Sequence, residues 1–132
     1  DLASVHQGAL MFKEVVRMGA EPISAAQFRH GPIEIINPVH RYVVFARQGR
    51  TGKFLLKLAD DIRKNGGRVL LFSDLTVEDI TNVRLVQVAP LRLGLGTLVD
   101  SVYIQLLTHE LARRAGLEPG KFWIAEDVTR EE

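Results

Sequence analysis

The chain has 132 residues, a length that fits one domain, and 46% of them are apolar, which is enough for a hydrophobic core. Its net charge of +1 gives no electrostatic basis for binding nucleic acid or an anionic membrane surface. The absence of cysteine excludes disulfides, catalytic thiols and cysteine-based zinc sites.

We expect a cytoplasmic protein. A chain without cysteine is compatible with a reducing compartment. The sequence also shows no signal peptide and no apolar run of about 18 residues that would span a membrane. It opens at Asp1 without a methionine, so we expect a piece of a longer protein.

Apolar residues at helical spacing predict a first helix over residues 5–18 that ends at Gly19. A second, short helix is predicted from a Ser24 cap to about Arg29, where the Gly31-Pro32 pair breaks it. The predicted apolar face of the first helix consists of Leu10, Met11, Val15 and Met18.

Two continuous apolar runs predict strands over residues 42–46 and 69–72, and a third strand is predicted over 83–88. Helices are predicted over about 51–65 and 98–115, and a turn over 79–82. Apolar strands that alternate with helices indicate a parallel sheet covered on both faces. We therefore predict a three-layer α/β/α domain with a mainly parallel sheet, of the flavodoxin-like or Rossmann-like kind. The predicted buried stripe of the helix over 51–65 is Phe54, Leu55, Leu58, Ala59 and Ile62.

A basic loop after the first predicted strand is a candidate anion site. The segment Arg47-Gln48-Gly49-Arg50-Thr51-Gly52-Lys53 opens a predicted helix, and ligands of open α/β sheets bind at the carboxyl ends of strands. Gln48, Arg50 and Thr51 are its candidate substrate-binding residues. The spacing is not that of a P-loop, and an ordinary basic turn is the alternative.

Two other patterns predict little. Gly94-Leu95-Gly96 lacks the third glycine of a dinucleotide fingerprint, so a flexible helix entrance is the better interpretation. No metal site is predicted, because the four histidines show no metal-ligand spacing: they are His6, His30, His40 and His109.

Glu14 and His30 are the candidate acid–base groups. Glu14 has Leu10 and Met18 four residues away on either side, and an apolar surrounding would raise a carboxylate's pKa and suit it to proton abstraction. An edge-of-stripe surface carboxylate is the alternative. For His30, which precedes the Gly31-Pro32 break, the alternative is capping of a helix end.

These two residues belong to a longer pattern. The segment Gly8-Ala9-Leu10-Met11-Phe12-Lys13-Glu14, followed by Ala20-Glu21 and then Arg29-His30-Gly31-Pro32, resembles the sugar isomerase (SIS) domain family. It is most similar to the second SIS module in the isomerase domain of glucosamine–fructose-6-phosphate aminotransferases, with related phosphosugar deaminases and deglycases.

The resemblance implies roles for both residues. Glu14 would move a proton between C1 and C2 of an open-chain hexose or hexosamine 6-phosphate. His30 would open the sugar ring and would act in the site of a neighbouring subunit, so the protein would be at least a dimer. Lys13 and Arg29 lie beside them as candidate substrate-binding residues, and the chemistry requires no cofactor.

The sequence departs from the aminotransferase pattern at several positions. Met11 replaces a lysine, and alignment of the tail on Val128-Thr129 places Glu126 where the aminotransferases have another lysine; Lys121 is the only lysine in the tail. These differences favour deamination or deglycation over glucosamine synthesis. The family's Ser/Thr-rich phosphate loop is absent, so residues 1–132 are predicted to be a single SIS module, the C-terminal half of a two-module protein.

Two alternatives remain at this point. The first is a non-catalytic module that binds phosphosugars to sense or regulate. The second is a purely structural half that serves oligomerisation.

Overall fold

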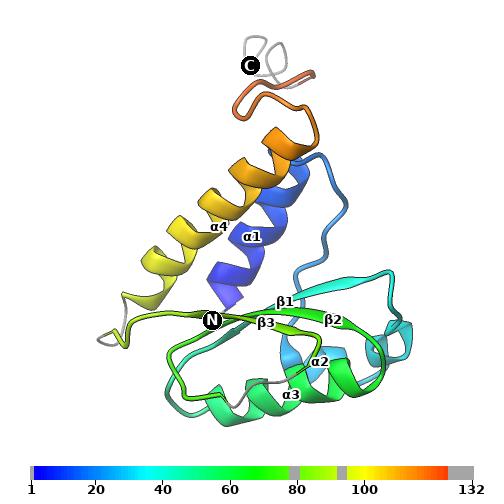
Figure 1. Ribbon diagram of the computed structural model, residues 1–132, viewed down its shortest axis with the longest axis vertical. Coiled ribbons are helices and arrows are strands. Elements are labelled where there is room, and N and C mark those ends of the chain that lie inside the picture. Colours follow the sequence, from blue (N-terminus) through cyan, green and yellow to red (C-terminus); the bar gives the residue numbers. More distant parts are fainter. Residues whose placement is uncertain (1, 78–80, 92–94, 125–132) are drawn as a thin grey trace. The chain divides into compact units, whose positions relative to one another are not determined.

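The structure is a computed structural model that describes residues 2–77, 81–91 and 95–124 (Figure 1). These residues form two compact units. The sheet unit is Ile23–Gly96, and the helix-pair unit is Leu2–Pro22 with the residues from Thr97 onward. The elements in chain order are α1 (Leu2–Glu14), α2 (Ala25–Arg29), the 3-10 helix η1 (Pro32–Ile35), β1 (Arg41–Ala46), α3 (Gly52–Lys64), β2 (Arg68–Ser73), β3 (Val83–Gln87) and α4 (Gly96–Arg114).

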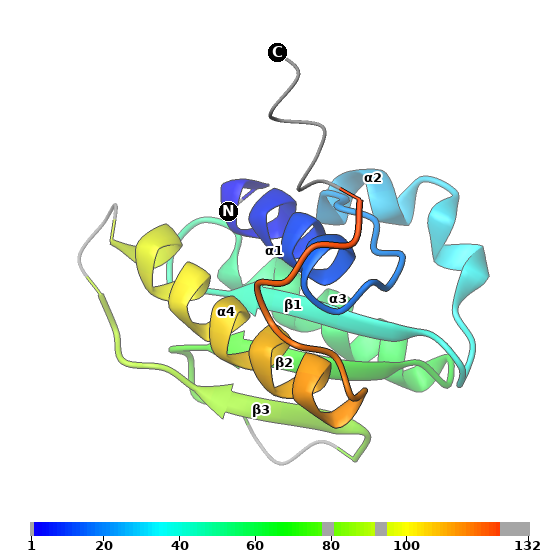
Figure 2. The same ribbon diagram turned by 90° about the horizontal axis from the view of Figure 1, so that it is seen from above.

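The sheet unit contains a parallel sheet with strand order β1-β2-β3 (Figure 2). In its register, Val44 of β1 is opposite Leu71 of β2, and Leu71 is opposite Leu85 of β3. Helix α3 connects β1 to β2, as parallel strands require. The α/β class and the parallel sheet predicted from continuous apolar runs are confirmed. The buried core of this unit is Phe28, Val44, Ala46, Leu58, Ala59, Ile62, Val69 and Leu71.

The helix-pair unit joins α1 to α4 through small and polar residues. The Ser4 hydroxyl donates a hydrogen bond of 2.9 Å to Oδ2 of Asp100, and both residues are fully buried. One turn further on, Gly8 leaves just enough space for the neighbouring helix, since a Cβ there would lie 3.4 Å from Cδ1 of Ile104. The two helices therefore approach closely along the Ser4–Gly8 side of α1.

The predicted end and apolar face of the first helix are wrong. Helix α1 ends at Glu14, and Arg17 adopts a left-handed backbone with φ 59°, while the Met18 amide donates to the Phe12 carbonyl at 3.1 Å. Leu10 and Met18 are about half exposed, at 49% and 53%. The prediction failed because the small residues of α1, and not its largest apolar ones, allow the closest helix packing.

Several predicted features lie partly or wholly outside the described residues. Of the turn predicted over 79–82, only the last two residues are described, and Asn82 has the left-handed backbone common in turns, with φ 68°. Gly94, Glu126 and the Val128-Thr129 pair are outside. Within the described ranges, no helix combines the length and apolar character needed to cross a membrane.

Candidate functional site

Helix α2 presents His30 and is fixed at its start by its own side chains. Ser24 and Gln27 form a capping box: the Gln27 amide donates to the Ser24 hydroxyl at 3.2 Å, and the Ser24 amide donates to Oε1 of Gln27 at 3.3 Å. Phe28 is buried and contacts the Tyr42 ring edge-on, with 5.8 Å between ring centroids. A helix of five residues would not be stable alone, so the capping box and the packing of Phe28 are what stabilise α2.

Arg29 ties the other end of α2 to α3. Its Nη2 lies 2.7 Å from Oδ2 of Asp61, and its guanidinium lies over the Phe54 ring, 5.0 Å from the centroid. Partial burial of Asp61 opposes its ionisation, but the hydrogen bond from Arg29 and the charges of Lys57 and Arg29 outweigh it, so the pKa of Asp61 is lowered. Arg29 is thus engaged in an internal ion pair.

His30 is the residue at which α2 ends. Its amide donates to the Gln27 carbonyl at 3.0 Å, and its side chain is exposed. Gly31 follows with φ 133°, a backbone conformation that residues with a Cβ rarely adopt. Pro32 then begins η1. The predicted helix end at Gly31-Pro32 is confirmed, and it leaves His30 accessible at the end of α2.

Glu14 and Lys13 lie on the last turn of α1, and both are exposed. The expectation that Glu14 lies against an apolar stripe of its own helix is wrong, because Leu10 and Met18 are themselves about half exposed. Glu14 is accessible to a ligand in the helix-pair unit, but its own helix does not desolvate it.

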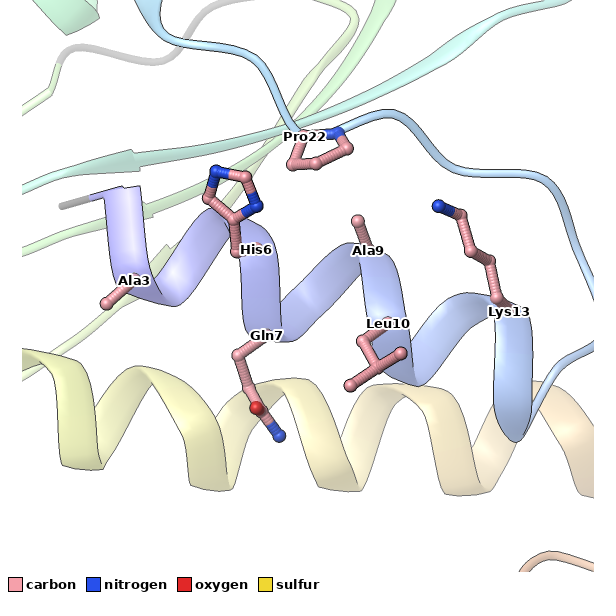
Figure 3. A pocket seen from close by; sticks show the side chains of 7 residues that line it. All are labelled: Ala3, His6, Gln7, Ala9, Leu10, Lys13 and Pro22. Atoms are coloured by element: carbon pink, nitrogen blue, oxygen red, sulfur yellow. The ribbon is translucent and has the colours of Figure 1, made fainter.

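A depression of about 440 Å³ follows α1 (Figure 3). Figure 3 shows His6 and Lys13 on the side of α1 that faces Pro22, with Ala9 between them. Neither His6 nor Pro22 was expected at a site from the sequence; the seven-residue interval between His6 and Lys13, two helical turns, is the signal that could have indicated His6. The lining residues are Ala3, His6, Gln7, Ala9, Leu10, Lys13 and Pro22.

The loop from β1 to α3 already holds a carboxylate. The Gln48 amide donates to Oδ1 of Asp74 at 2.6 Å. Thr51 precedes α3 without a capping hydrogen bond from its side chain, and the side chains of Gln48, Arg50 and Thr51 are exposed. An anion at this loop would meet the Asp74 carboxylate, so the geometry favours an ordinary basic turn.

Arg17 holds the end of the described C-terminal segment. Its Nη2 donates to the Lys121 carbonyl at 3.0 Å, and its guanidinium lies over the Trp123 ring, 3.6 Å from the centroid. The Lys121 ammonium lies 3.4 Å from Oε2 of Glu118. Across the described part of the chain, no group of three or more histidine or acidic residues is arranged to hold a metal ion.

Comparison with known proteins shows what the chain is similar to. No family model matches the sequence. The chain is 30% identical over 111 residues to glutamine–fructose-6-phosphate aminotransferase (isomerizing) of Thermus thermophilus. The matched region covers 83% of this chain and 18% of the relative. It is 29% identical over 122 residues to the enzyme of the same name from Pyrococcus horikoshii, covering 87% of this chain and 19% of the relative.

A solved structure has a similar fold. The C-terminal domain of glucosamine-fructose-6-phosphate aminotransferase from Francisella tularensis matches with a TM-score of 0.79 and 20% identity, over 86% of this chain and 33% of that domain. The resemblance to the sugar isomerase (SIS) domain family is confirmed. The chain spans about a fifth of the length of the curated relatives it matches.

The sheet unit and the helix-pair unit carry different parts of the predicted site. Lys13 and Glu14 lie in the helix-pair unit, on the last turn of α1. Arg29 and His30 lie in the sheet unit at the end of α2, with the loop that contains Gln48, Arg50 and Thr51. The catalytic and binding roles of these residues remain predictions.

Proposed function

We propose that this chain is the second SIS module of an enzyme that moves a proton between C1 and C2 of a hexose or hexosamine 6-phosphate. The observation that carries the proposal is the similarity to isomerizing aminotransferases over 83% of the chain, together with the KE…HGP pattern at Glu14 and His30. Isomerisation, deamination and deglycation all use this proton transfer. Met11 in place of a lysine favours the last two.

Glu14 is the proposed proton shuttle. An accessible carboxylate on a helix end can reach a substrate carbon, accept its proton and return it to the neighbouring carbon. Since α1 alone leaves Glu14 exposed, we propose that substrate and the rest of the assembly supply the water exclusion that this chemistry uses.

His30 is the proposed ring-opening residue. An imidazole both donates and accepts protons near neutral pH, which ring opening requires. Three features hold the end of α2 in place: the capping box, the buried Phe28 and the Arg29–Asp61 ion pair. His30 therefore extends from a fixed support and is accessible to a neighbouring subunit, as the proposed action in trans needs.

Substitution Glu14→Gln tests the proposal. It keeps the size of the side chain and removes the base, so exchange of the C1/C2 proton with deuterated solvent should fall by at least about 100-fold while substrate still binds. Proton NMR of fructose 6-phosphate and glucosamine 6-phosphate with the intact protein measures the exchange. Glu118→Gln, which changes another exposed carboxylate of the same unit, should leave it unchanged. Retained exchange in Glu14→Gln would falsify the assignment.

A non-catalytic phosphosugar sensor is the second candidate. The exposure of Glu14 and the replacement of a lysine by Met11 favour it. The same NMR experiment separates the two: binding of a hexose 6-phosphate without any proton exchange or turnover in the intact wild-type protein supports the sensor.

A further inference from the structure

Arg17 occupies a backbone position that favours glycine. Its φ of 59° lies in the left-handed region, where the Cβ of any other residue is crowded. Helices commonly end on a residue in this conformation, and that residue is usually glycine. An arginine here carries a backbone cost, so we expect its side chain to make contacts that offset the strain.

Those contacts form a clasp between the end of α1 and the C-terminal segment, residues 118–124. The Arg17 guanidinium lies 3.6 Å from the centroid of the Trp123 ring, and its Nη2 donates to the Lys121 carbonyl at 3.0 Å. Between described residues, no other hydrogen bond or ion pair links this segment to the rest of the chain. The segment crosses the end of the helix-pair unit at which α1 and α4 both stop (Figure 1, Figure 2).

The clasp follows directly after Glu14, which is the last residue of α1. The last turn of a helix has carbonyls without helical partners and frays readily. Two anchors come next in the chain: Val16 is buried, and Arg17 makes the clasp. A carboxylate that moves a proton between neighbouring carbons has to be held to within about 0.5 Å of its productive position. The clasp is placed to supply that hold.

We propose that Arg17 is a positioning residue, whose clasp with Trp123 and the Lys121 carbonyl fixes the last turn of α1 and, with it, the Glu14 carboxylate. Arg17 lies between the two halves of the KE…HGP pattern, and neither half includes it. The consequence for catalysis rests on the proposed function of Glu14, whereas the fixed helix end rests on the contacts of Arg17 alone.

Trp123 is the only tryptophan of the chain, so its fluorescence reports the clasp directly. Arg17→Gln should shift the emission and increase quenching by acrylamide, because the guanidinium no longer covers one face of the ring. Amide hydrogen exchange on the last turn of α1, followed by NMR, should become faster in Arg17→Gln and in Trp123→Leu. The double variant should add little, because both changes break one contact. Arg113→Gln, whose arginine pairs with Glu110 of its own helix, should change neither measurement.

A glycine variant separates positioning from stability. Because φ 59° suits glycine, Arg17→Gly removes the clasp without straining the backbone, and urea unfolding of the intact protein should show no loss of stability. Its kcat for exchange of the C1/C2 proton of fructose 6-phosphate should fall at least about 10-fold with KM little changed, since a misplacement of about 1 Å costs up to about 100-fold. Arg17→Lys keeps a cation for the ring and should recover part of the rate. A merely structural role of Arg17 predicts lower stability and an unchanged kcat.

The positioning role is overturned if hydrogen exchange on the last turn of α1 is unchanged in Arg17→Gln and Trp123→Leu, or if Arg17→Gly keeps the wild-type kcat. Failure of the proposed function looks different. In that case the wild type shows no proton exchange at C1/C2, while the fluorescence and hydrogen-exchange changes still appear in the Arg17 variants. The clasp that fixes the Glu14 turn then stands, and only its catalytic consequence falls.

Discussion

At the scale of single residues, Gly31 decides how His30 is presented. Its φ of 133° turns the chain out of α2, and Pro32 starts η1 immediately afterwards. No atom lies within 4 Å of the position where a Cβ would be, so the need for glycine comes from the backbone conformation alone. A larger residue here would strain the turn without creating a clash.

Gly31→Ala should therefore destabilise the protein by about 1–3 kcal/mol, the cost of a strained backbone conformation. Urea unfolding measures the change. The matched control is Gly19→Ala: Gly19 has neither a positive φ nor an atom within 4 Å of its Cβ position, and its replacement should be neutral or slightly stabilising. Equal stability of the two variants would contradict this account of Gly31.

At the scale of elements, the ion pair between Arg29 and Asp61 joins α2 to α3. The pair spans 32 positions of sequence, and both side chains are only about one-quarter exposed or less. Asp60, by contrast, pairs with Arg63 and Lys64 of its own helix. Asp61 thus stabilises a tertiary contact between two helices, whereas Asp60 stabilises only its own helix.

Asp61→Asn should destabilise the protein by about 1 kcal/mol at neutral pH, a value reduced from that of a fully buried pair because of the partial exposure. The pKa of Asp61 is lowered from its ordinary 3.8, so its contribution is complete above that value and is lost as the pH falls through the lower folded pKa. The difference in the free energy of unfolding between wild type and Asp61→Asn should therefore shrink when urea unfolding is repeated below pH 3.8.

Asp60→Asn is the control for this prediction. It removes a carboxylate whose pKa is also lowered, chiefly by the hydrogen bonds from Lys64 and then Arg63. Because its pairs are local to α3, the expected loss is a few tenths of a kcal/mol. An Asp61→Asn variant that is no less stable than Asp60→Asn would show that the tertiary pair contributes nothing.

At the scale of the whole molecule, the proposed action of His30 in trans makes a quantitative prediction. In a dimer that combines one Glu14→Gln subunit with one His30→Ala subunit, one site receives neither functional group and the other receives both. Random mixing of the two inactive variants should then restore roughly a quarter of the wild-type activity. An assay of turnover after co-refolding or co-expression measures the recovery.

Each variant alone is the control for the mixture and should be inactive. If the mixture is as inactive as its components while gel filtration shows mixed dimers, Glu14 and His30 act within one subunit. If gel filtration shows only monomers, the proposed dimer is wrong.

The sequence by itself determined most of the sheet unit. Continuous apolar runs predicted β1 and β2 because strands of a parallel sheet bury both faces, and a run such as Tyr42 to Ala46 has no charged residue to place outward. The third strand was predicted over a run that also contains Arg84 and Gln87. Ser24 and Gly31-Pro32 predicted α2 because capping and chain reversal depend on local chemistry. The family likeness rested on the same local segment, with Glu14 upstream of it.

Only the tertiary structure decided which side of α1 is buried and what lies on the opposite side. The Ser4–Asp100 hydrogen bond and the Gly8–Ile104 approach join residues about 96 positions apart, and no local pattern encodes such a contact. Because small residues made that contact, Leu10 was left about half exposed, and His6 and Lys13 lie along the depression on α1. Helical spacing identifies residues that share a face, whereas the packing partner selects the face that is buried.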